Sequence, residues 1–118
     1  MATKFRPILE KLVRDAGLEG AVLTTADGLP VEAVLPAGLS EDRLAAMSAA
    51  ILSLGERAAM ELEKGKLEQI TVKSEGGYVI VTGIGNEAVL TVMAGPDAKL
   101  GLLYLEIRKA EEELSKLL

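Results

Sequence analysis

The feature that most constrains this chain is a long helical stretch, Ser40–Lys64, whose middle carries no charge. Ser40 is a suitable N-cap, and the two acidic residues after it favour the positive end of the helix dipole. From Leu44 to Gly55 every residue is apolar, small or hydroxylated. A helix that lacks a polar face is normally buried on all sides. The sequence therefore predicts a central helix that packs on the rest of the chain and is covered on its other side as well.

The apolar side chains of this helix fall on two arcs when they are placed at about 100° per residue. One arc holds larger residues: Leu44, Met47, Ile51, Leu54, Ala58 and Leu62. The other holds mostly small ones: Ala45, Ala49, Leu52, Ser53 and Ala59. Because both arcs are apolar, the sequence leaves open which of them faces a sheet. A three-layer monomer could bury both arcs. Small side chains, however, allow a second helix to approach within about 8–10 Å, which favours an interface with another protein.

Composition excludes several classes of function. The 118 residues carry a net charge of −5 without a basic stripe, which disfavours binding to nucleic acid or to an anionic membrane. Uncharged runs are shorter than the ~20 residues of a membrane span, so we expect no membrane insertion and a cytoplasmic location. Cysteine and histidine are both absent, so thiolate and histidine-based mechanisms are impossible for this chain alone. We expect no catalytic residue, no cofactor and no metal site.

The order of predicted elements indicates an α+β fold. Helices are expected from Thr3 to about Ala16, over the central stretch, and after Gly95-Pro96-Asp97. Strands are expected at Gly20–Thr25, Val31–Val34, Leu67–Lys73, Tyr78–Ile84 and Ala88–Ala94. Glycine-containing turns, including Asp27-Gly28, separate strands that follow one another directly, which is typical of antiparallel hairpins. The sequence therefore predicts one domain over residues 1–118, with a five-stranded antiparallel sheet and helices packed on it.

Two motifs suggest chemistry that their context explains otherwise. Gly83-Ile84-Gly85-Asn86-Glu87-Ala88 matches the G-x-G-x-x-A pattern of a phosphate loop, but such a loop needs a helix after the strand. Here a strand follows, so a hairpin turn is the simpler interpretation. Asp27 could be a metal or acid–base carboxylate, but it has no acidic neighbour at ligand spacing, and the Asp-Gly turn explains it.

Three stretches carry a family resemblance: GAVLTTADGLPVE at 20–32, the alanine-rich central helix, and GNEAVLTV at 85–92 leading to Gly101-Leu102-Leu103. Together they resemble the Roadblock/dynein light chain family, whose bacterial and archaeal members include regulators of small Ras-like GTPases. The resemblance covers about Leu12 to Tyr104. It implies a dimer in which the central helices pair and edge strands join into one sheet. By position, the implied dimer interface is Ala45, Ser48, Ala49, Leu52, Gly55, Glu56 and Ala59, with Ile70 and Val72 on a neighbouring strand.

The leading hypothesis is a homodimeric, non-enzymatic module that binds and regulates a small Ras-like GTPase, by activating hydrolysis or by sensing its nucleotide state. Arg43 and Arg57 on the central helix are candidate GTPase contacts, because an arginine supplied in trans can stabilise the charge in phosphoryl transfer. Most surface arginines are solvated or paired, and Arg57 can pair with Glu61 one turn later. Two alternatives remain: a scaffold subunit of a larger complex or motor, and a sensor domain for a small ligand.

Overall fold

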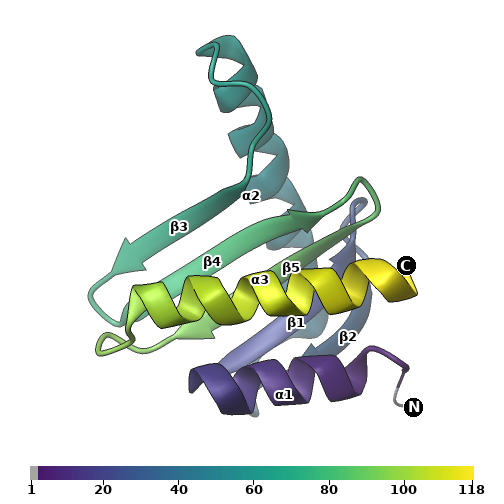
Figure 1. Ribbon diagram of the computed structural model, residues 1–118, viewed down its shortest axis with the longest axis vertical. Coiled ribbons are helices and arrows are strands. Elements are labelled where there is room, and N and C mark those ends of the chain that lie inside the picture. The colour runs from purple at the N-terminus through teal and green to yellow at the C-terminus, as the bar shows by residue number, and fades with distance from the viewer. Residues whose placement is uncertain (1–2) are drawn as a thin grey trace.

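The computed structural model describes residues 3–118 and confirms the α+β architecture (Figure 1). The elements are α1 (Arg6–Ala16), β1 (Gly20–Thr25), β2 (Pro30–Val34), α2 (Glu41–Glu61), β3 (Gln69–Ser74), β4 (Gly77–Ile84), β5 (Ala88–Ala94) and α3 (Leu100–Leu117). The strands form one five-stranded antiparallel sheet in the order β2-β1-β5-β4-β3. α1 and α3 lie side by side on one face, and α2 lies on the other and projects beyond the sheet (Figure 1).

The main hydrophobic core lies between the sheet and the pair α1 and α3. Alternate strand residues point to this face because side chains alternate along a strand. The helices contribute leucines and an isoleucine at helical spacing, and the buried residues of α3 recur every three or four positions. The largest fully buried members of this core are Leu9, Leu23, Ile80, Leu90, Leu103, Ile107 and Leu114. This packing makes the α1–α3 face the closed side of the molecule.

The first hairpin follows its predicted turn chemistry. Gly28 has a φ of +95°, a conformation that glycine adopts without a Cβ penalty, and its N–H donates to the Thr25 carbonyl. β2 begins at Pro30, one residue before the predicted start, and lies at the edge of the sheet. An edge position suits Pro30 because proline has no N–H to donate to a further strand.

The start of α2 confirms the predicted cap, since the Arg43 N–H donates to Ser40 Oγ over 3.3 Å. The end of α2 differs from the prediction. The helix stops at Glu61, before the predicted limit, because Glu63 adopts a left-handed φ of 59°. Glycine often ends a helix, but Gly65 lies in the loop that follows rather than at the helix end.

Other element boundaries also differ from the sequence prediction. α3 begins at Leu100 rather than directly after Gly95-Pro96-Asp97, because the Ala98 N–H closes a separate turn onto the Gly95 carbonyl. Thr3 does not cap α1 directly. Its Oγ1 accepts from the Phe5 N–H over 3.1 Å, in the turn that precedes the helix. Gly17, with a φ of 64°, ends α1 directly after Ala16, the predicted last residue.

Candidate functional site

The side of α2 that carries Ala45, Ser48 and Gly55 lies against the chain's own sheet, whereas Ser53 of the predicted small-residue arc is exposed. Ala45 and Ser48 are 0% and 2% exposed. Lower down the helix, a Cβ placed on Gly55 would overlap the Ile70 side chain and lie 3.2 Å from Leu67 Cδ2. The absence of a side chain at Gly55 therefore lets α2 approach β3 closely. Glycine within a helix costs about 1 kcal/mol relative to alanine, and the close contact that offsets this cost is with the chain's own strand.

Ser48 also anchors α2 to the centre of the sheet through a buried hydrogen bond. Thr91 Oγ1 on β5 donates to Ser48 Oγ over 2.6 Å, and Ser48 Oγ donates to the Leu44 carbonyl over 2.7 Å. Both hydroxyls are thereby satisfied inside an otherwise apolar layer, where an unpaired hydroxyl would be costly. This pair fixes which arc of α2 faces inward.

The opposite arc of α2 is left open. Met47 and Leu54 are 51% and 68% exposed, and the small residues Ala46, Ala50 and Ser53 between them are also exposed. No charged residue interrupts this arc between Leu44 and Gly55. The outer face of a surface helix normally carries charged or polar side chains. An uncharged, exposed face of this kind is typical of protein–protein contact surfaces.

Some of the residues predicted for the interface are therefore buried against the sheet, and others are accessible to a partner. Ala45 and Ser48 have no side-chain surface left for a partner, because the sheet covers them. The other predicted residues, on α2 and β3, are either half-buried or exposed. The half-buried ones are Ala49, Leu52, Gly55, Ala59 and Ile70; the exposed ones are Glu56 and Val72. The interface itself remains a prediction, but the arc of α2 that is free to form it is the one with Met47 and Leu54.

β3 provides a second open surface beside α2. It is an edge strand that pairs with β4, and the four residues Thr71–Ser74 are all exposed. Val72, 38% exposed, pairs with the half-buried Val79 on β4. A free strand edge offers unpaired backbone N–H and C=O groups to another strand. The outer arc of α2 and the free edge of β3 together form the candidate functional site.

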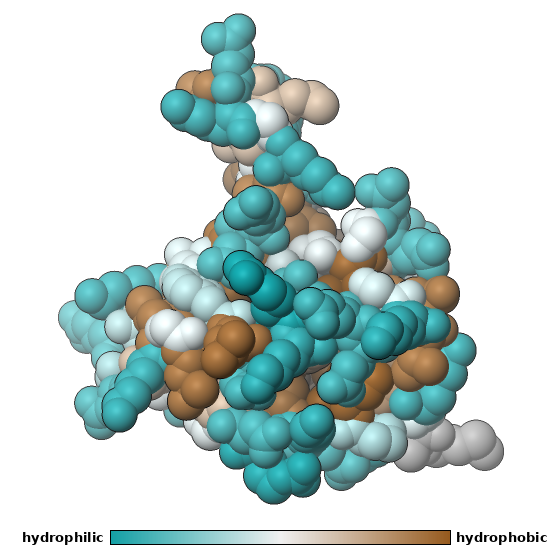
Figure 2. Space-filling view, in the orientation of Figure 1, coloured by the Kyte–Doolittle hydropathy of each residue, from teal (hydrophilic) through white to brown (hydrophobic). Residues whose placement is uncertain are grey.

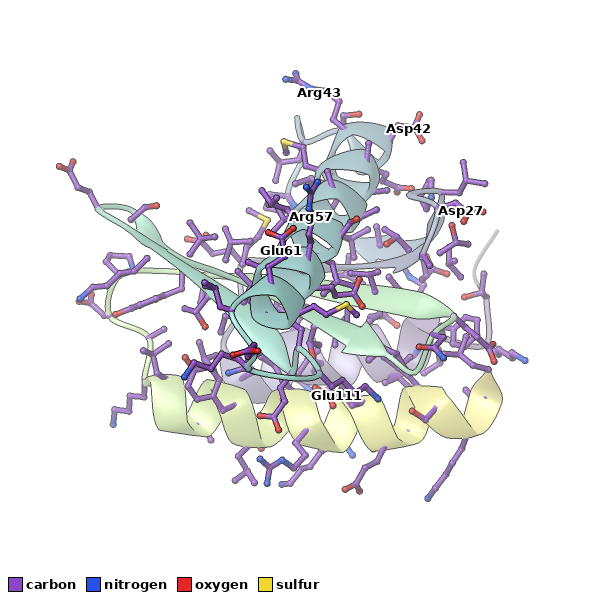
Figure 3. The ribbon with its side chains drawn as sticks, turned by 90° about the horizontal axis from the view of Figure 1, so that it is seen from above. Asp27, Asp42, Arg43, Arg57, Glu61 and Glu111 are labelled. Carbon is purple, nitrogen blue, oxygen red and sulfur yellow. The ribbon has the colours of Figure 1, made fainter. Side chains whose placement is uncertain are left out.

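The two candidate arginines lie on α2 away from the buried arc. Arg57 Nε bonds Glu61 Oε1 over 3.2 Å, and the two side chains are 75% and 66% exposed. Figure 3 shows this pair on one part of the helix, with Arg43 and Asp42 towards its other end. An exposed pair at this spacing contributes at most about 0.5 kcal/mol. Arg57 is therefore free to exchange Glu61 for an anionic partner at little cost.

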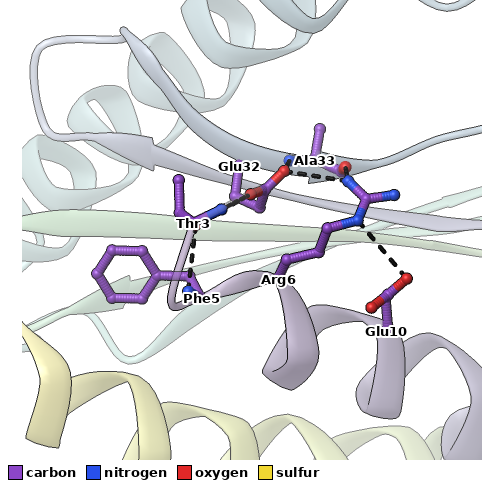
Figure 4. Close-up of polar contacts among 6 residues, drawn as sticks. All are labelled: Thr3, Phe5, Arg6, Glu10, Glu32 and Ala33. Atoms are coloured by element: carbon purple, nitrogen blue, oxygen red, sulfur yellow. Dashed lines mark hydrogen bonds and ion pairs between the residues drawn. The ribbon is translucent and has the colours of Figure 1, made fainter. Parts of the chain in front are cut away.

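Glu32 forms a polar network that sequence reasoning missed (Figure 4). Its carboxylate is 9% exposed and accepts from the Thr3 N–H and Oγ1 over 2.8 and 2.9 Å, from Arg6 over 3.1 Å, and from the Ala33 N–H over 3.2 Å. Burial raises the pKa of Glu32, but these hydrogen bonds outweigh burial and hold the pKa below its usual value. The network ties the N-terminal segment to edge strand β2. A lone charge within the apolar run PVEAV was the available signal.

The remaining motifs have structural explanations. Gly83 and Gly85 flank the end of β4, and after a short turn a strand, β5, follows them rather than a helix. Asp27 is exposed in the β1–β2 turn (Figure 3). Over residues 3–118, acidic side chains do not gather in a group of three that could hold a metal ion.

Comparison with known proteins places this geometry in a family. Residues 5–94 match the Roadblock/LC7 domain. The chain belongs to the Roadblock/LC7 family. Uncharacterized protein MJ1340 of Methanocaldococcus jannaschii is 29% identical over 107 residues, which cover 91% of this chain and 93% of the relative.

Solved structures share the Roadblock/LC7 fold with this chain. Myxococcus xanthus MglB has a TM-score of 0.92 at 22% identity, covering 98% of this chain and 94% of that one. A structure described as MglB with tetrameric arrangement has a TM-score of 0.88 at 22% identity, covering 96% and 86%. Membership of the family supports a non-enzymatic module. Among the described residues, no helix of this Roadblock/LC7 chain is both long and apolar enough to cross a bilayer.

Proposed function

We propose that this Roadblock/LC7 chain forms a homodimer that binds and regulates a small Ras-like GTPase. The observation that carries the proposal is the uncharged outer arc of α2, in which Met47 and Leu54 are more than half exposed. Gly55 on the same helix lies against Ile70 of β3, so α2 and this edge strand are neighbours and one partner could cover the outer arc and the free edge together. The family resemblance implies a dimer in which central helices pair and edge strands join, and such a dimer would cover these two surfaces.

A second copy of the chain is the partner that fits both surfaces. In a twofold dimer the same patch meets itself, so α2 would pack on α2 while β3 extended the sheet through the β3 of the other copy. The small residues Ala46 and Ala50 would allow the two helices to approach closely. The tetrameric arrangement of MglB, which shares this fold, also supports self-association.

The first test is the solution mass of a Leu54→Glu variant. Burying a leucine side chain contributes about 1.5–3 kcal/mol, and a charge left in an apolar interface costs several kcal/mol more. The substitution occurs twice in a twofold dimer, so the dissociation constant should rise by at least about 100-fold. Leu105→Glu is the matched control, because Leu105 is 51% exposed on α3, on the other face of the sheet. We expect Leu54→Glu to be monomeric and Leu105→Glu to remain dimeric at micromolar concentration. If both variants remain dimeric, this interface is refuted.

The second test is binding to Ras-like GTPases loaded with GDP or with a GTP analogue. The proposed complex forms with a GTPase in one nucleotide state in preference to the other. Arg43→Ala and Arg57→Ala should weaken it. Both arginines lie on the same face of α2 as Met47 and Leu54, beyond the two ends of the uncharged stretch. The solution mass of each variant is therefore measured first, to separate loss of the GTPase from loss of the dimer. A hydrolysis assay on the same complex then distinguishes activation from sensing. A dimer that binds neither nucleotide state would instead support the scaffold alternative.

A further inference from the structure

Thr82 on β4 lies between two hydrogen-bond acceptors. Its Oγ1 is 3.0 Å from the Glu68 backbone carbonyl and 3.1 Å from Glu111 Oε1 on α3. Glu68 directly precedes β3, in the segment that connects it to α2. Glu111 projects from α3 (Figure 3) and is half-buried. Three separate parts of the fold therefore meet at one hydroxyl group.

The number of protons at this point decides which contacts can be hydrogen bonds. A threonine hydroxyl has one proton to donate and lone pairs with which to accept. An ionised Glu111 can only accept a hydrogen bond, so the single Thr82 hydroxyl proton can then be donated either to the carboxylate or to the Glu68 carbonyl. A hydrogen bond to a charged acceptor is the stronger of the two. A protonated Glu111 donates to Thr82 Oγ1 instead, which leaves the threonine proton for Glu68. Only the protonated state satisfies both contacts.

We propose that Thr82 and Glu111 form a proton-dependent latch on the segment that leads from α2 into β3. With Glu111 protonated, Thr82 holds the Glu68 carbonyl and fixes the start of β3 to β4. With Glu111 ionised, the carboxylate accepts the hydrogen bond from the threonine hydroxyl and the Glu68 carbonyl is released to solvent.

The surroundings of Glu111 favour the protonated state more than water does. Burial is the largest influence and raises the pKa of Glu111, and the nearby carboxylates of Glu112 and Glu68 raise it further. The Thr82 hydroxyl and the Arg108 guanidinium act in the opposite direction without cancelling this rise. Lys66, from the connecting segment, lines the same hollow of about 500 Å³ beside Glu111. Solvent can enter there and receive the released carbonyl.

The latch acts on the segment that positions the edge strand. Because β3 is half of the proposed pairing surface, proton uptake by Glu111 would order that surface for a partner. This consequence depends on the proposed homodimer, whereas the latch does not. Backbone exchange in the connecting segment reports on the latch alone, and the solution mass reports on the dimer, so each can fail separately.

Hydrogen–deuterium exchange of the segment 65–70 tests the latch once the carboxyl carbon resonance of Glu111 has given its titration midpoint. After correction for the intrinsic effect of pH, protection should be about 3–10-fold higher well below the midpoint than well above it, as expected for one net hydrogen bond. Glu111→Gln, whose amide can donate to Thr82 at any pH, should keep the high protection throughout. Glu112→Gln on the same helix is the control and should behave like the wild type.

Variants at Thr82 complete the test. Thr82→Val removes the hydroxyl and should show low protection at every pH, whereas Thr82→Ser retains the hydroxyl and should keep the pH dependence. The Ser variant also keeps the test valid if the Val variant fails to fold. Equal wild-type protection on both sides of the Glu111 midpoint would overturn the latch. Loss of the pH dependence in Thr82→Ser, or its survival in Glu111→Gln, would do the same.

Discussion

Gly55→Ala gives a direct test of how α2 is seated on the sheet. In an isolated helix this change stabilises by about 1 kcal/mol, because alanine is the better helix former. In this fold the added Cβ would overlap Ile70 and press on Leu67. The sign of the effect therefore depends on whether the close approach of α2 to β3 is real.

The magnitude follows from two opposing contributions. Overpacking a well-filled site costs about 1–3 kcal/mol. Subtracting the helix gain of about 1 kcal/mol leaves a net destabilisation of about 0–2 kcal/mol. Ile70→Val removes the methyl group that the new Cβ would overlap and by itself costs about 0.5–1.5 kcal/mol. In the Ile70→Val background, Gly55→Ala should therefore cost about 1 kcal/mol less than in the wild type, as expected for residues in contact.

The assay is urea unfolding of the four proteins in this double-mutant cycle at one fixed protein concentration, since self-association would add to the apparent stability. Gly101→Ala is the control for helix propensity. Gly101 lies in the first turn of α3, where an added Cβ meets no described heavy atom within 4 Å. That variant should be stabilised by up to about 1 kcal/mol. If Gly55→Ala is equally stabilised and its effect on the unfolding free energy simply adds to that of Ile70→Val, the result would refute a close contact between Gly55 on α2 and Ile70 on β3.

Three further predictions concern the core, the edge network and a turn. Leu114→Ala should lower the unfolding free energy by about 2–5 kcal/mol in urea denaturation, because Leu114 is 0% exposed. Glu32, whose pKa is lowered by folding, contributes stability above its unfolded-state pKa that is lost as pH falls through its lower folded-state pKa. Glu32→Gln should therefore lower Tm near neutral pH and flatten its decline in acid. Gly77→Ala should cost at least about 1–3 kcal/mol, because Gly77 has a φ of +133° and a Cβ there would collide with the Ala94 carbonyl. Gly76→Ala, with open space around it among the described atoms, should be close to neutral in the same thermal melt.

Local sequence patterns predicted most of the secondary structure. β1 and β5 have their predicted bounds, and Ser40 caps α2 as expected. These features depend on neighbouring residues alone: alternation along strands, a hydroxyl at an N-cap, and glycine in a turn. The boundaries that shifted, such as the start of α3 after the Gly95–Ala98 turn, depend on competition between overlapping turns, which sequence periodicity does not resolve.

The distribution of apolar side chains over the surface, shown in Figure 2, could not be predicted from composition. The α1–α3 side is mostly hydrophilic, yet apolar side chains show over the N-terminal half of α3, where Leu102 and Leu105 are exposed. The helical period of α3 identifies its buried positions, but it does not forbid leucines on the outer face. In the same way, the Glu32 and Glu111 networks join residues that are 26 to 29 positions apart, and no local pattern connects them.

The sequence by itself determined that this chain has a central helix apolar on every side, an α+β order of elements, and no cysteine or histidine for catalysis. The tertiary structure alone decided which side of that helix turns inward. Ala45, Ser48 and Gly55 face the sheet because small side chains permit close approach and because Ser48 meets a hydroxyl on Thr91. Hydropathy is nearly the same on both arcs, whereas shape and hydrogen-bond complementarity exist only between surfaces that the fold has brought together.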